Sequence, residues 1–328
     1  MKVAVTGGAG YIGSHAVVEL KDAGHDVVVL DNLSEGHPEA VKGTELREVD
    51  LADEDRTTQV LEENNVGAVM HFAAHAYVGE SVEDPEKYYF NNVVNTLRLL
   101  RAMRRTAVER FVFSGSCTVY GIPDRVPISE DFPLQPISPY GRTKATVERI
   151  LEDYAAAYDL KYASLRYFNA AGAMPDGSMG EDHAPETHLI PIIIQAALGV
   201  RDKITIFGTD YPTPDGTCIR DYIHVLDLGR AHVLALENLD EHAPVTYNLG
   251  TGQGHSVREV IEAVRQVSGR TIPVEEGERR PGDPPRLVAS PDKIRSDLGW
   301  EPRFPDLLQI VETAWEWHSS HPEGYSNG

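Results

Sequence analysis

The chain has 328 residues, which is long enough for a full sheet core and a second, smaller domain. Its formal net charge of −21 argues against nucleic acid and anionic membranes as partners, because the summed field repels phosphate. Hydrophobic residues make up 41%, as in ordinary globular proteins, and no apolar run approaches the ~20 residues that span a bilayer.

The first strand and the turn after it carry the clearest signal. An apolar run from Val3 to Val5 leads into Thr6-Gly7-Gly8-Ala9-Gly10-Tyr11-Ile12-Gly13. Glycines at 7, 10 and 13 let the backbone turn tightly and bring main-chain N–H groups against a diphosphate. A tight turn without any ligand would need similar residues, so this motif alone decides nothing.

A second strand completes the signature of a dinucleotide site. Residues 26–30 form an apolar strand that ends on Asp31, about twenty residues after the glycines. A carboxylate at that strand end accepts both hydroxyls of an adenosine ribose and repels a 2′-phosphate. The pattern therefore predicts NAD as cofactor rather than NADP.

Strands and helices alternate through the next part of the chain. We expect strands at 46–50, 66–72, 110–114 and 162–167, and helices at 53–65, 83–105 and from 138 or 140 to 158. This alternation predicts an α/β fold with a Rossmann-type, doubly wound parallel sheet. His71 lies inside a strand, where a core histidine is the simpler interpretation.

From Asn169 the pattern loosens into Gly- and Pro-rich loops, which suggests a second domain. We expect residues 219–223, a strand, and 225–239, a helix, to return to the first domain. The NAD-binding domain would then span 1–170 plus about 218–240. A smaller C-terminal α/β substrate-binding domain would span 171–217 and 241–328, with helices near 189–198, 256–268 and 307–319.

The candidate chemistry begins on the helix after Pro139. Tyr140 and Lys144 are four residues apart and share one helical face. One positive charge about 5.5 Å away is worth roughly 3 kcal/mol at an effective dielectric near 20, or about two pKa units. Lys144 and an oxidised nicotinamide together would bring the pKa of Tyr140 close to neutrality, less the cost of desolvation.

Ser116 follows the strand at 110–114 and would hold the same substrate hydroxyl. No Gly-x-Ser-x-Gly elbow occurs there, so a hydrolase nucleophile is not supported. A Tyr-x-x-x-Lys pair is common by chance. Its order after the glycine turn, Asp31 and Ser116 makes chance remote.

The sequence resembles the extended short-chain dehydrogenase/reductases and, among them, the UDP-galactose 4-epimerases. The similarity extends from Lys2 to about Tyr325. Besides the glycine turn, its most specific motifs are Asp31-Asn32-Leu33, Val78-Gly79-Glu80-Ser81, Ser138-Pro139-Tyr140-Gly141, Leu165-Arg166-Tyr167-Phe168-Asn169, Asp215-Gly216-Thr217 and Arg220-Asp221-Tyr222-Ile223-His224-Val225.

The resemblance implies roles for particular residues. Tyr140 would be the catalytic base, Lys144 its electrostatic partner and Ser116 the holder of the hydroxyl. Residues implied to bind NAD are Gly7, Gly10, Tyr11, Ile12, Gly13, Asp31, Asn32, Asp50, Leu51, Phe72, Ala73, Ala74, Lys144 and Tyr167. Residues implied to bind the UDP-sugar are Ser116, Tyr140, Asn169, His188, Leu189, Arg220, Tyr222, Arg280, Asp283 and Leu287.

The expected activity is reversible 4-epimerisation of UDP-glucose and UDP-galactose through a 4-keto intermediate with tightly bound NAD. An epimerase for another UDP-sugar (UDP-xylose/UDP-arabinose, UDP-GlcNAc/UDP-GalNAc or UDP-glucuronate) is the alternative. A 4,6-dehydratase would carry an Asp-Glu pair after the strand-end hydroxyl, where this chain has Cys117-Thr118. A silent regulator would have lost Tyr140 or Lys144, and both are present.

Three further expectations follow. The cluster Glu181, Asp182, His183, Glu186 and His188 resembles a metal site, but a loop of the sugar-binding domain explains it better, so no metal is expected. A homodimer is expected through the helices at 83–105 and 140–158. A cytoplasmic location is expected because no leader precedes the first strand, and Cys117 and Cys218 lack metal or redox spacing.

Overall fold

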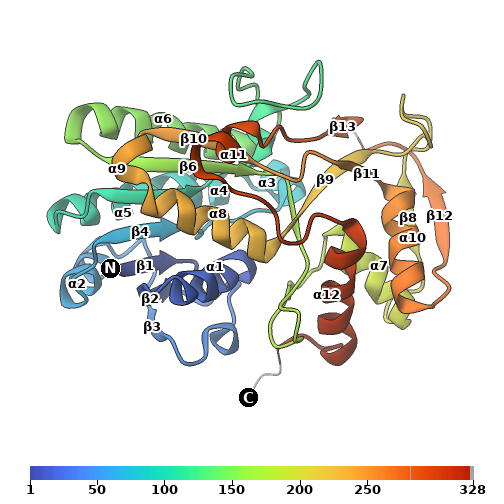
Figure 1. Cartoon of the computed structure of the whole chain (residues 1–328), viewed down its shortest axis with the longest axis horizontal. Helices are drawn as coiled ribbons and strands as arrows, with labels where there is room; N and C mark the ends of the chain where they lie inside the picture. Colours follow the sequence, from blue (N-terminus) through green and yellow to red (C-terminus); the bar gives the residue numbers. More distant parts are fainter. Residues whose placement is uncertain (281, 326–328) are drawn as a thin grey trace.

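The centre of the molecule is a sheet of seven parallel strands in the order β10-β6-β5-β4-β1-β2-β3 (Figure 1). The computed structural model describes residues 1–280 and 282–325. The chain builds the sheet outward from β1 in both directions, so the carboxyl ends of β1 and β4 flank a topological switch point. The strands are β1 (Lys2–Thr6), β2 (Asp26–Asp31), β3 (Glu45–Glu48), β4 (Ala68–His71), β5 (Arg110–Ser114), β6 (Lys161–Tyr167) and β10 (Val245–Leu249).

Helices cover both faces of this sheet, which confirms the predicted doubly wound α/β fold. On one face the apolar sides of α1 and α8 pack together, with α9, α11 and the buried Trp300 beside them. On the other face α2, α5 and α6 cover the strands. These elements are α1 (Tyr11–Asp22), α2 (Glu54–Glu63), α5 (Asn95–Arg105), α6 (Pro139–Tyr158), α8 (Val225–Glu237), α9 (Leu239–His242), α11 (Asp292–Leu298) and the short η1 (Pro38–Val41).

A smaller unit lies beside the carboxyl end of the large sheet (Figure 1). In it β9 pairs with β7, β11 and β13, and β8 pairs with β12. Its core is formed largely by the three helices α7, α10 and α12, whose isoleucine, valine and alanine side chains interlock. The elements are β7 (Asn169–Ala171), α7 (Leu189–Leu198), β8 (Ile204–Phe207), β9 (Ile219–His224), β11 (Gly254–Ser256), α10 (Val257–Ser268), β12 (Val274–Gly277), β13 (Arg286–Leu287) and α12 (Leu307–Ser320).

The segment predicted as one helix over residues 83–105 is not one regular helix. α3 (Val78–Glu83) ends at Asp84, whose carboxylate accepts from the Lys87 backbone N and starts α4 (Pro85–Tyr88). A π-helical turn, η2 (Tyr89–Val94), then leads into α5. Pro85 suits a first helical position because it has no N–H to leave unpaired. A new helix therefore begins at Pro85, two residues after the predicted start at residue 83.

The return to the first domain differs from the prediction. α8 does return and packs on α1, but β9 lies in the small sheet rather than the large one. β10 instead forms the edge of the large sheet beside β6, although residues 241–328 were all expected in the second domain. Both strands are short, and the sequence of a short strand does not specify which strand is its neighbour.

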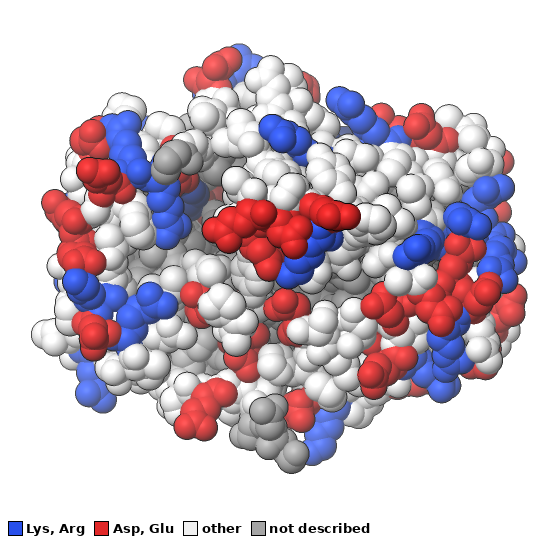
Figure 2. Space-filling view, turned by 180° about the vertical axis from the view of Figure 1, so that it is seen from behind, with Lys and Arg blue, Asp and Glu red and all other residues white. Residues whose placement is uncertain are grey.

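The charges on the surface are mixed. In Figure 2, Lys and Arg side chains lie next to Asp and Glu side chains over the face shown, without a broad basic patch. None of the helices among the described residues has the length and apolar character needed to cross a bilayer.

Candidate active site

The three glycines of the predicted motif, Gly7 and Gly10 in the turn after β1 and Gly13 in the first turn of α1, lack a side chain for different reasons. A Cβ at Gly7, where φ is +69°, would collide with the Ala73 backbone, and one at Gly13 would collide with the Gly7 carbonyl. A Cβ at Gly10 would meet only the Gly7 oxygen, at an acceptable 3.4 Å. The fold itself therefore requires Gly7 and Gly13, whereas Gly10 leaves room at a helix N-terminus that no side chain caps.

Asp31 ties the end of β2 to this turn. Its carboxylate accepts from the backbone N of Ala9 at 2.9 Å and from that of Leu33 at 2.9 Å. Burial raises the pKa of Asp31, and these two hydrogen bonds act in the opposite direction. The carboxylate is thus fixed beside the glycine turn, where the sequence analysis expected it.

The other expected cofactor residues are spread along the same edge. Asn32 donates to the exposed Asp50 at 3.3 Å, whereas Leu51 is buried in the core beneath α2. Phe72 packs 4.8 Å from the ring of His232, measured between ring centroids, and leads into the half-buried Ala73 and Ala74. Ile12 packs on the core under α1, and the Tyr11 hydroxyl donates to the Gly172 carbonyl at 2.6 Å.

Tyr140 and Lys144 begin α6. Ser138 caps this helix by accepting from the Gly141 backbone N at 3.1 Å, and Pro139 occupies its first turn. Both functional side chains are buried, with 6% of Tyr140 and 3% of Lys144 exposed. Lys144 Nζ lies 5.9 Å from the centroid of the Tyr140 ring and donates to the Ser114 carbonyl at 2.8 Å.

Burial dominates the electrostatics of this pair. Burial raises the pKa of Tyr140 well above its ordinary value, Tyr167 adds to this, and the Ser116 hydroxyl acts in the opposite direction. Burial also lowers the pKa of Lys144 to about 7, although Glu148 raises it. The protein's own residues therefore do not bring the phenol near neutrality, because desolvation of both groups outweighs their attraction.

Ser116 lies at the carboxyl end of β5, where it caps the short helix η3 (Cys117–Tyr120). Its Oγ is 2.9 Å from Thr118 Oγ1 and accepts from the Thr118 backbone N at 3.3 Å. On the neighbouring strand the Tyr167 hydroxyl is 2.8 Å from Ser114 Oγ. Hydroxyl groups thus line this sheet edge; Thr118 was not predicted, although it follows the same strand end.

The residues expected to hold the sugar nucleotide lie mainly on the small sheet. Arg220, on β9, forms an ion pair with Asp283 and donates to the Ile219 carbonyl at 2.8 Å. Leu287, on β13, is the register partner of Arg220. Asn169 Nδ2 donates to the Asp221 carbonyl at 2.9 Å.

The remaining expected contacts are less closely grouped. Tyr222 is buried in the core of the small unit, next to Arg220 in the chain. Arg280 is exposed and stacks over the Phe207 ring at 4.1 Å. His188 is the N-terminal cap residue of α7, and Leu189 begins that helix.

Comparison with known proteins identifies the family. Residues 3–250 match the NAD dependent epimerase/dehydratase family. A UDP-glucose 4-epimerase of Halalkalibacterium halodurans is 50% identical over 327 residues, which cover 99% of this chain and 98% of that relative. One from Streptococcus mutans is 50% identical over 331 residues, covering 100% of this chain and 99% of that relative. The chain belongs to this epimerase family.

Solved structures of the epimerase family agree with the fold described above. The UDP-glucose 4-epimerase of Brucella ovis in complex with NAD superposes with a TM-score of 0.94 at 52% identity, covering 96% of this chain and 97% of that one. The UDP-glucose 4-epimerase of Bifidobacterium longum in complex with NAD+ and UDP gives 0.94 at 38% identity, covering 99% and 100%. The resemblance predicted from the motifs is confirmed.

A buried ion pair behind the epimerase helix α6 was not predicted. Glu148 accepts from Arg166 Nη2 at 2.6 Å and from Ser164 Oγ at 2.7 Å. Arg166 Nη1 also donates to the Tyr120 hydroxyl at 2.8 Å. Tyr140, Lys144 and Glu148 follow one another at intervals of four residues, so the helical period was the available signal.

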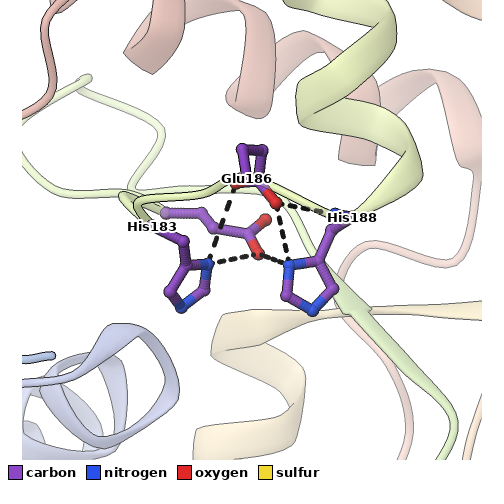
Figure 3. Close-up of side chains that lie close together, drawn as sticks. His183, Glu186 and His188 are labelled. Atoms are coloured by element: carbon purple, nitrogen blue, oxygen red, sulfur yellow. Dashed lines mark hydrogen bonds and ion pairs between the residues drawn. The ribbon is translucent and has the colours of Figure 1, made fainter. Parts of the chain in front are cut away.

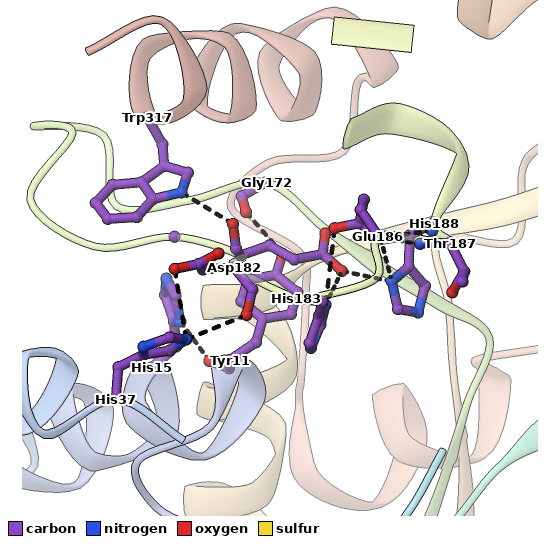
Figure 4. Close-up of polar contacts among 12 residues, drawn as sticks. Tyr11, His15, His37, Gly172, Asp182, His183, Glu186, Thr187, His188 and Trp317 are labelled. Atoms are coloured by element: carbon purple, nitrogen blue, oxygen red, sulfur yellow. Dashed lines mark hydrogen bonds and ion pairs between the residues drawn. The ribbon is translucent and has the colours of Figure 1, made fainter. Parts of the chain in front are cut away.

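The loop before α7 brings most of its acidic residues and histidines together (Figure 4). Glu181, His183, Glu186 and His188 face one another, whereas Asp182 accepts from the Tyr325 backbone N at 2.8 Å and pairs with His37. The ring of Tyr11 meets that of His183 edge-on at 6.3 Å between centroids. This loop therefore packs against the start of α1.

Proposed function

We propose that this chain catalyses reversible 4-epimerisation of UDP-glucose and UDP-galactose with tightly bound NAD. The observation that carries the proposal is the convergence of Tyr140, Lys144 and Ser116 at one end of the sheet, beside a glycine turn and Asp31. Near full-length similarity to UDP-glucose 4-epimerases supports it.

The residues at the sheet edge fit NAD. The space over Gly10 and the uncapped N-terminus of α1 suit a diphosphate, and the fixed Asp31 carboxylate suits a ribose with free hydroxyls. When bound, NAD supplies the acceptor and donor of a hydride at the sugar's C4 and, in its oxidised form, a positive charge. A 2′-phosphate would be repelled by Asp31, which favours NAD over NADP.

Tyr140 acts in this proposal as the base. It takes the proton of the sugar 4-hydroxyl, which Ser116 and the neighbouring Thr118 hold by their hydroxyls. Because burial raises the pKa of Tyr140, the phenolate needs positive charge nearby. Lys144 contributes part of that charge, and its hydrogen bond to the Ser114 carbonyl fixes its ammonium beneath the ring.

Epimerisation also needs a firm grip on the nucleotide and a loose grip on the hexose, since the 4-keto sugar must turn over before hydride returns to its other face. Arg220 supplies a planar guanidinium suited to a phosphate, and Asp283 holds it in place. The groups near the hexose are small hydroxyls, Ser116 and Thr118, which permit this rotation.

The decisive experiment is incubation of the purified protein with UDP-galactose and no added cofactor. We expect UDP-glucose to accumulate until the two sugars reach equilibrium, and NAD to be released when the protein is denatured. Bound NADP, or a strict requirement for an added hydride donor with net reduction of the substrate, would contradict the proposal.

Two glycine variants separate cofactor binding from folding. Gly10→Ala places a methyl group where the protein leaves space, so we expect a folded protein with little bound NAD. Gly13→Ala drives a methyl group into the Gly7 carbonyl, so we expect a loss of stability as well. Full NAD occupancy in Gly10→Ala would show that the space over Gly10 does not hold the diphosphate.

The alternative is a 4-epimerase acting mainly on another UDP-sugar. Leu287 is half-buried against a cluster that includes Cys117 and Phe168, and the size of its side chain is intermediate between that of Tyr and that of Ser. Competition between UDP-galactose, UDP-N-acetylgalactosamine and UDP-arabinose in one reaction would rank the substrates. The main proposal expects UDP-galactose to be consumed first.

We also propose a homodimer formed through α3, η2 and α6. Val82, Phe90 and Tyr89 are 64%, 55% and 39% exposed, a run of apolar surface beside α6. Leu100, Val147 and Leu151 were expected in the interface but face the subunit's own core. The proposed contact is therefore limited to the exposed residues Val82, Tyr89 and Phe90. Light scattering should report a dimer, and Phe90→Asp should shift it to a monomer; a parent that is monomeric at micromolar concentration would refute the dimer.

The cytoplasmic location stays a prediction. Cys117 and Cys218 are both free and buried, as suits a reducing compartment. Fractionation of cells that produce the natural protein would test it.

A further inference from the structure

Four metal-ligating side chains meet in the loop before α7. The spacing is Glu181-x-His183-x-x-Glu186-x-His188, and the four side chains offer donor atoms that all lie within 4.8 Å of one another. His188 Nδ1 is 2.8 Å from Glu181 Oε1 and 3.0 Å from Glu186 Oε1. His183 Nδ1 is 3.2 Å from Glu181 Oε1 and 3.8 Å from Glu186 Oε2. In Figure 3 one nitrogen of each imidazole, Nδ1, points to the carboxylates, and the other nitrogen of each ring points away from them.

The two carboxylates are buried, and their charge needs compensation. Only 4% of the Glu181 side chain and 5% of the Glu186 side chain are exposed. Within the described part of the chain, the ion-pair partners of both are the two histidines alone, with no Lys or Arg. Either two protonated imidazoles or one divalent cation therefore balances the charge of −2.

The orientation of His183 distinguishes these two possibilities. Its Nδ1 is fully buried, yet it makes no hydrogen bond of acceptable geometry to any described residue, although a carboxylate oxygen is 3.2 Å away. A proton on Nδ1 would favour rotation of the ring until the N–H pointed at that oxygen. A metal ion instead requires the lone pairs of all four donors to point at one common centre.

The separations suit such a centre. Zinc binds imidazole nitrogen and carboxylate oxygen at about 2.0–2.2 Å, so tetrahedral donors lie ~3.4 Å apart. The four His–Glu contacts range from 2.8 to 3.8 Å, which brackets that value, and all four donor atoms lie within 4.8 Å of one another. Imidazole nitrogen and carboxylate oxygen are both donor types that zinc binds.

We propose that Glu181, His183, Glu186 and His188 bind one zinc ion. The zinc replaces the two imidazolium protons, so the cluster stays neutral when both histidines become neutral ligands. The sequence alone favoured a loop of the sugar-binding domain over a metal site, because spacing along a loop does not show where its side chains point.

A zinc ion here would be structural. The loop packs against α1 through Tyr11 and against the segment after β4 through Tyr77, whose rings meet His183 edge-on at 6.3 and 6.0 Å between centroids. Its end, His188 and Leu189, starts α7. The ion would fix the positions of His188 and Leu189, which are expected to bind the UDP-sugar. Only this effect on substrate binding rests on the proposed function.

The test begins with the parent chain, purified without an affinity tag, stripped with a chelator and dialysed. Isothermal titration with Zn²⁺ should give one site, and titration with Co²⁺ should give the intense visible absorption of a tetrahedral centre. The absence of a one-to-one site for Zn²⁺, or a Co²⁺ spectrum of the weak octahedral kind, would overturn the proposal without any variant.

Two variants then test the ligands. His183→Asn and Glu186→Gln should each weaken Zn²⁺ binding by at least about 100-fold, more than the loss of an outer-shell partner. His37→Asn is the matched control, since it removes a histidine that pairs with Asp182 of the same loop but lies outside the cluster. We expect its affinity to match that of the parent.

Equal affinity in the parent and both ligand variants would place the zinc elsewhere and refute the assignment. If one of the two variants fails to fold, the other still tests the ligands, and the Co²⁺ spectrum of the parent tests the geometry. Because every readout is metal binding, a failed epimerase assay would leave the result standing, and a failed metal titration would leave the epimerase proposal standing.

Discussion

In two buried polar regions of this molecule the pKa values of the ionisable side chains shift in opposite senses, toward the neutral forms in one and toward the charged forms in the other. At the start of α6, burial raises the pKa of Tyr140 and lowers that of Lys144 to about 7, so both groups move toward their neutral forms. In the loop before α7, burial opposes charging too, but the carboxylates raise the pKa of His183 to about 9 and that of His188 to about 10. There the groups move toward their charged forms.

The difference lies in the partners within reach. Each histidine of the loop has a carboxylate oxygen about 3 Å away. Lys144 instead donates to a neutral carbonyl, and Glu148, the carboxylate that raises its pKa, is already paired with Arg166. Without a bound ion, the two histidines of the loop compensate its carboxylates, and the proposed zinc ion would take over that role; the α6 region becomes competent when a bound group supplies charge.

The start of α6, with Tyr140 and Lys144, is the uncompensated region. The largest effect is expected when its proposed base, Tyr140, is removed. Tyr140→Phe should lower turnover of UDP-galactose by about 10²–10⁴-fold, because a positioned proton acceptor contributes that much. UDP binding should stay nearly unchanged, since the ring does not hold the nucleotide. Steady-state rates and UDP titration measure the two effects; activity within a few-fold of the parent would exclude Tyr140 as the base.

Breaking the compensated pair behind α6 should be the next largest effect. Glu148→Gln leaves the Arg166 guanidinium buried without its counter-charge, and we expect a loss of about 3–5 kcal/mol in the free energy of unfolding. The double variant Glu148→Gln with Arg166→Met should recover much of it. Urea denaturation of both proteins measures this, and a double variant no more stable than Glu148→Gln would contradict the charge explanation.

A pH dependence is expected from the histidine nearest the uncompensated region. Burial, and then the charge of Lys144, lower the pKa of His71 to about 3, while its ring bonds to Thr6 and Thr96. An unfolded histidine takes up its proton near pH 6.5, so the unfolded state gains stability as the pH falls below that value. Going from about pH 7.5 to about pH 5 should cost roughly 2 kcal/mol through this residue.

The variant His71→Gln isolates this contribution. Its free energy of unfolding should fall less than that of the parent over the same pH interval, by the roughly 2 kcal/mol just derived. His242→Gln, on the short helix α9, is the control for loss of a histidine. An identical pH dependence in the parent and His71→Gln would mean that His71 does not stay neutral in the folded protein.

Local patterns predicted the parts of this site that depend on local chemistry. The glycine turn, Asp31 and the Tyr140–Lys144 spacing all act within a turn of helix or at one strand end, so their residues could be read in sequence. The strands β1, β2 and β5 were likewise found, since each contains a continuous apolar run.

Features that join distant residues could not be predicted in this way. Glu148 and Arg166 meet because α6 packs on β6, and β10 joins the large sheet from 78 residues beyond β6. Likewise, His183 and Glu186 are adjacent in sequence to many other polar groups, and only the loop's path selects which of them converge. The extent to which burial raises the pKa of Tyr140 could not be read from the sequence either, because burial depends on the whole fold.

The smallest expected effect concerns Leu287, which borders the uncompensated region from the small sheet. We propose, from the resemblance to the epimerases, that this position borders the sugar's 2-substituent, where a bulky Tyr would exclude N-acetyl sugars and a small Cys or Ser would admit them. Leu is intermediate, and an apolar pocket discriminates one methylene by only about 1–3 kcal/mol. We therefore expect UDP-galactose to be preferred and UDP-N-acetylgalactosamine to be converted slowly.

Two substitutions test this in opposite directions. Leu287→Tyr should suppress the N-acetyl reaction selectively, and Leu287→Ser should raise it, each by about tenfold or more in the ratio of kcat/KM for the two substrates. The packing of Leu287 against a cluster that includes Phe168 and Ala289 gives the competing explanation, in which both variants lose stability and both reactions fall together. A ratio that stays unchanged while the melting temperature falls would mean that Leu287 packs the small sheet and does not select the sugar.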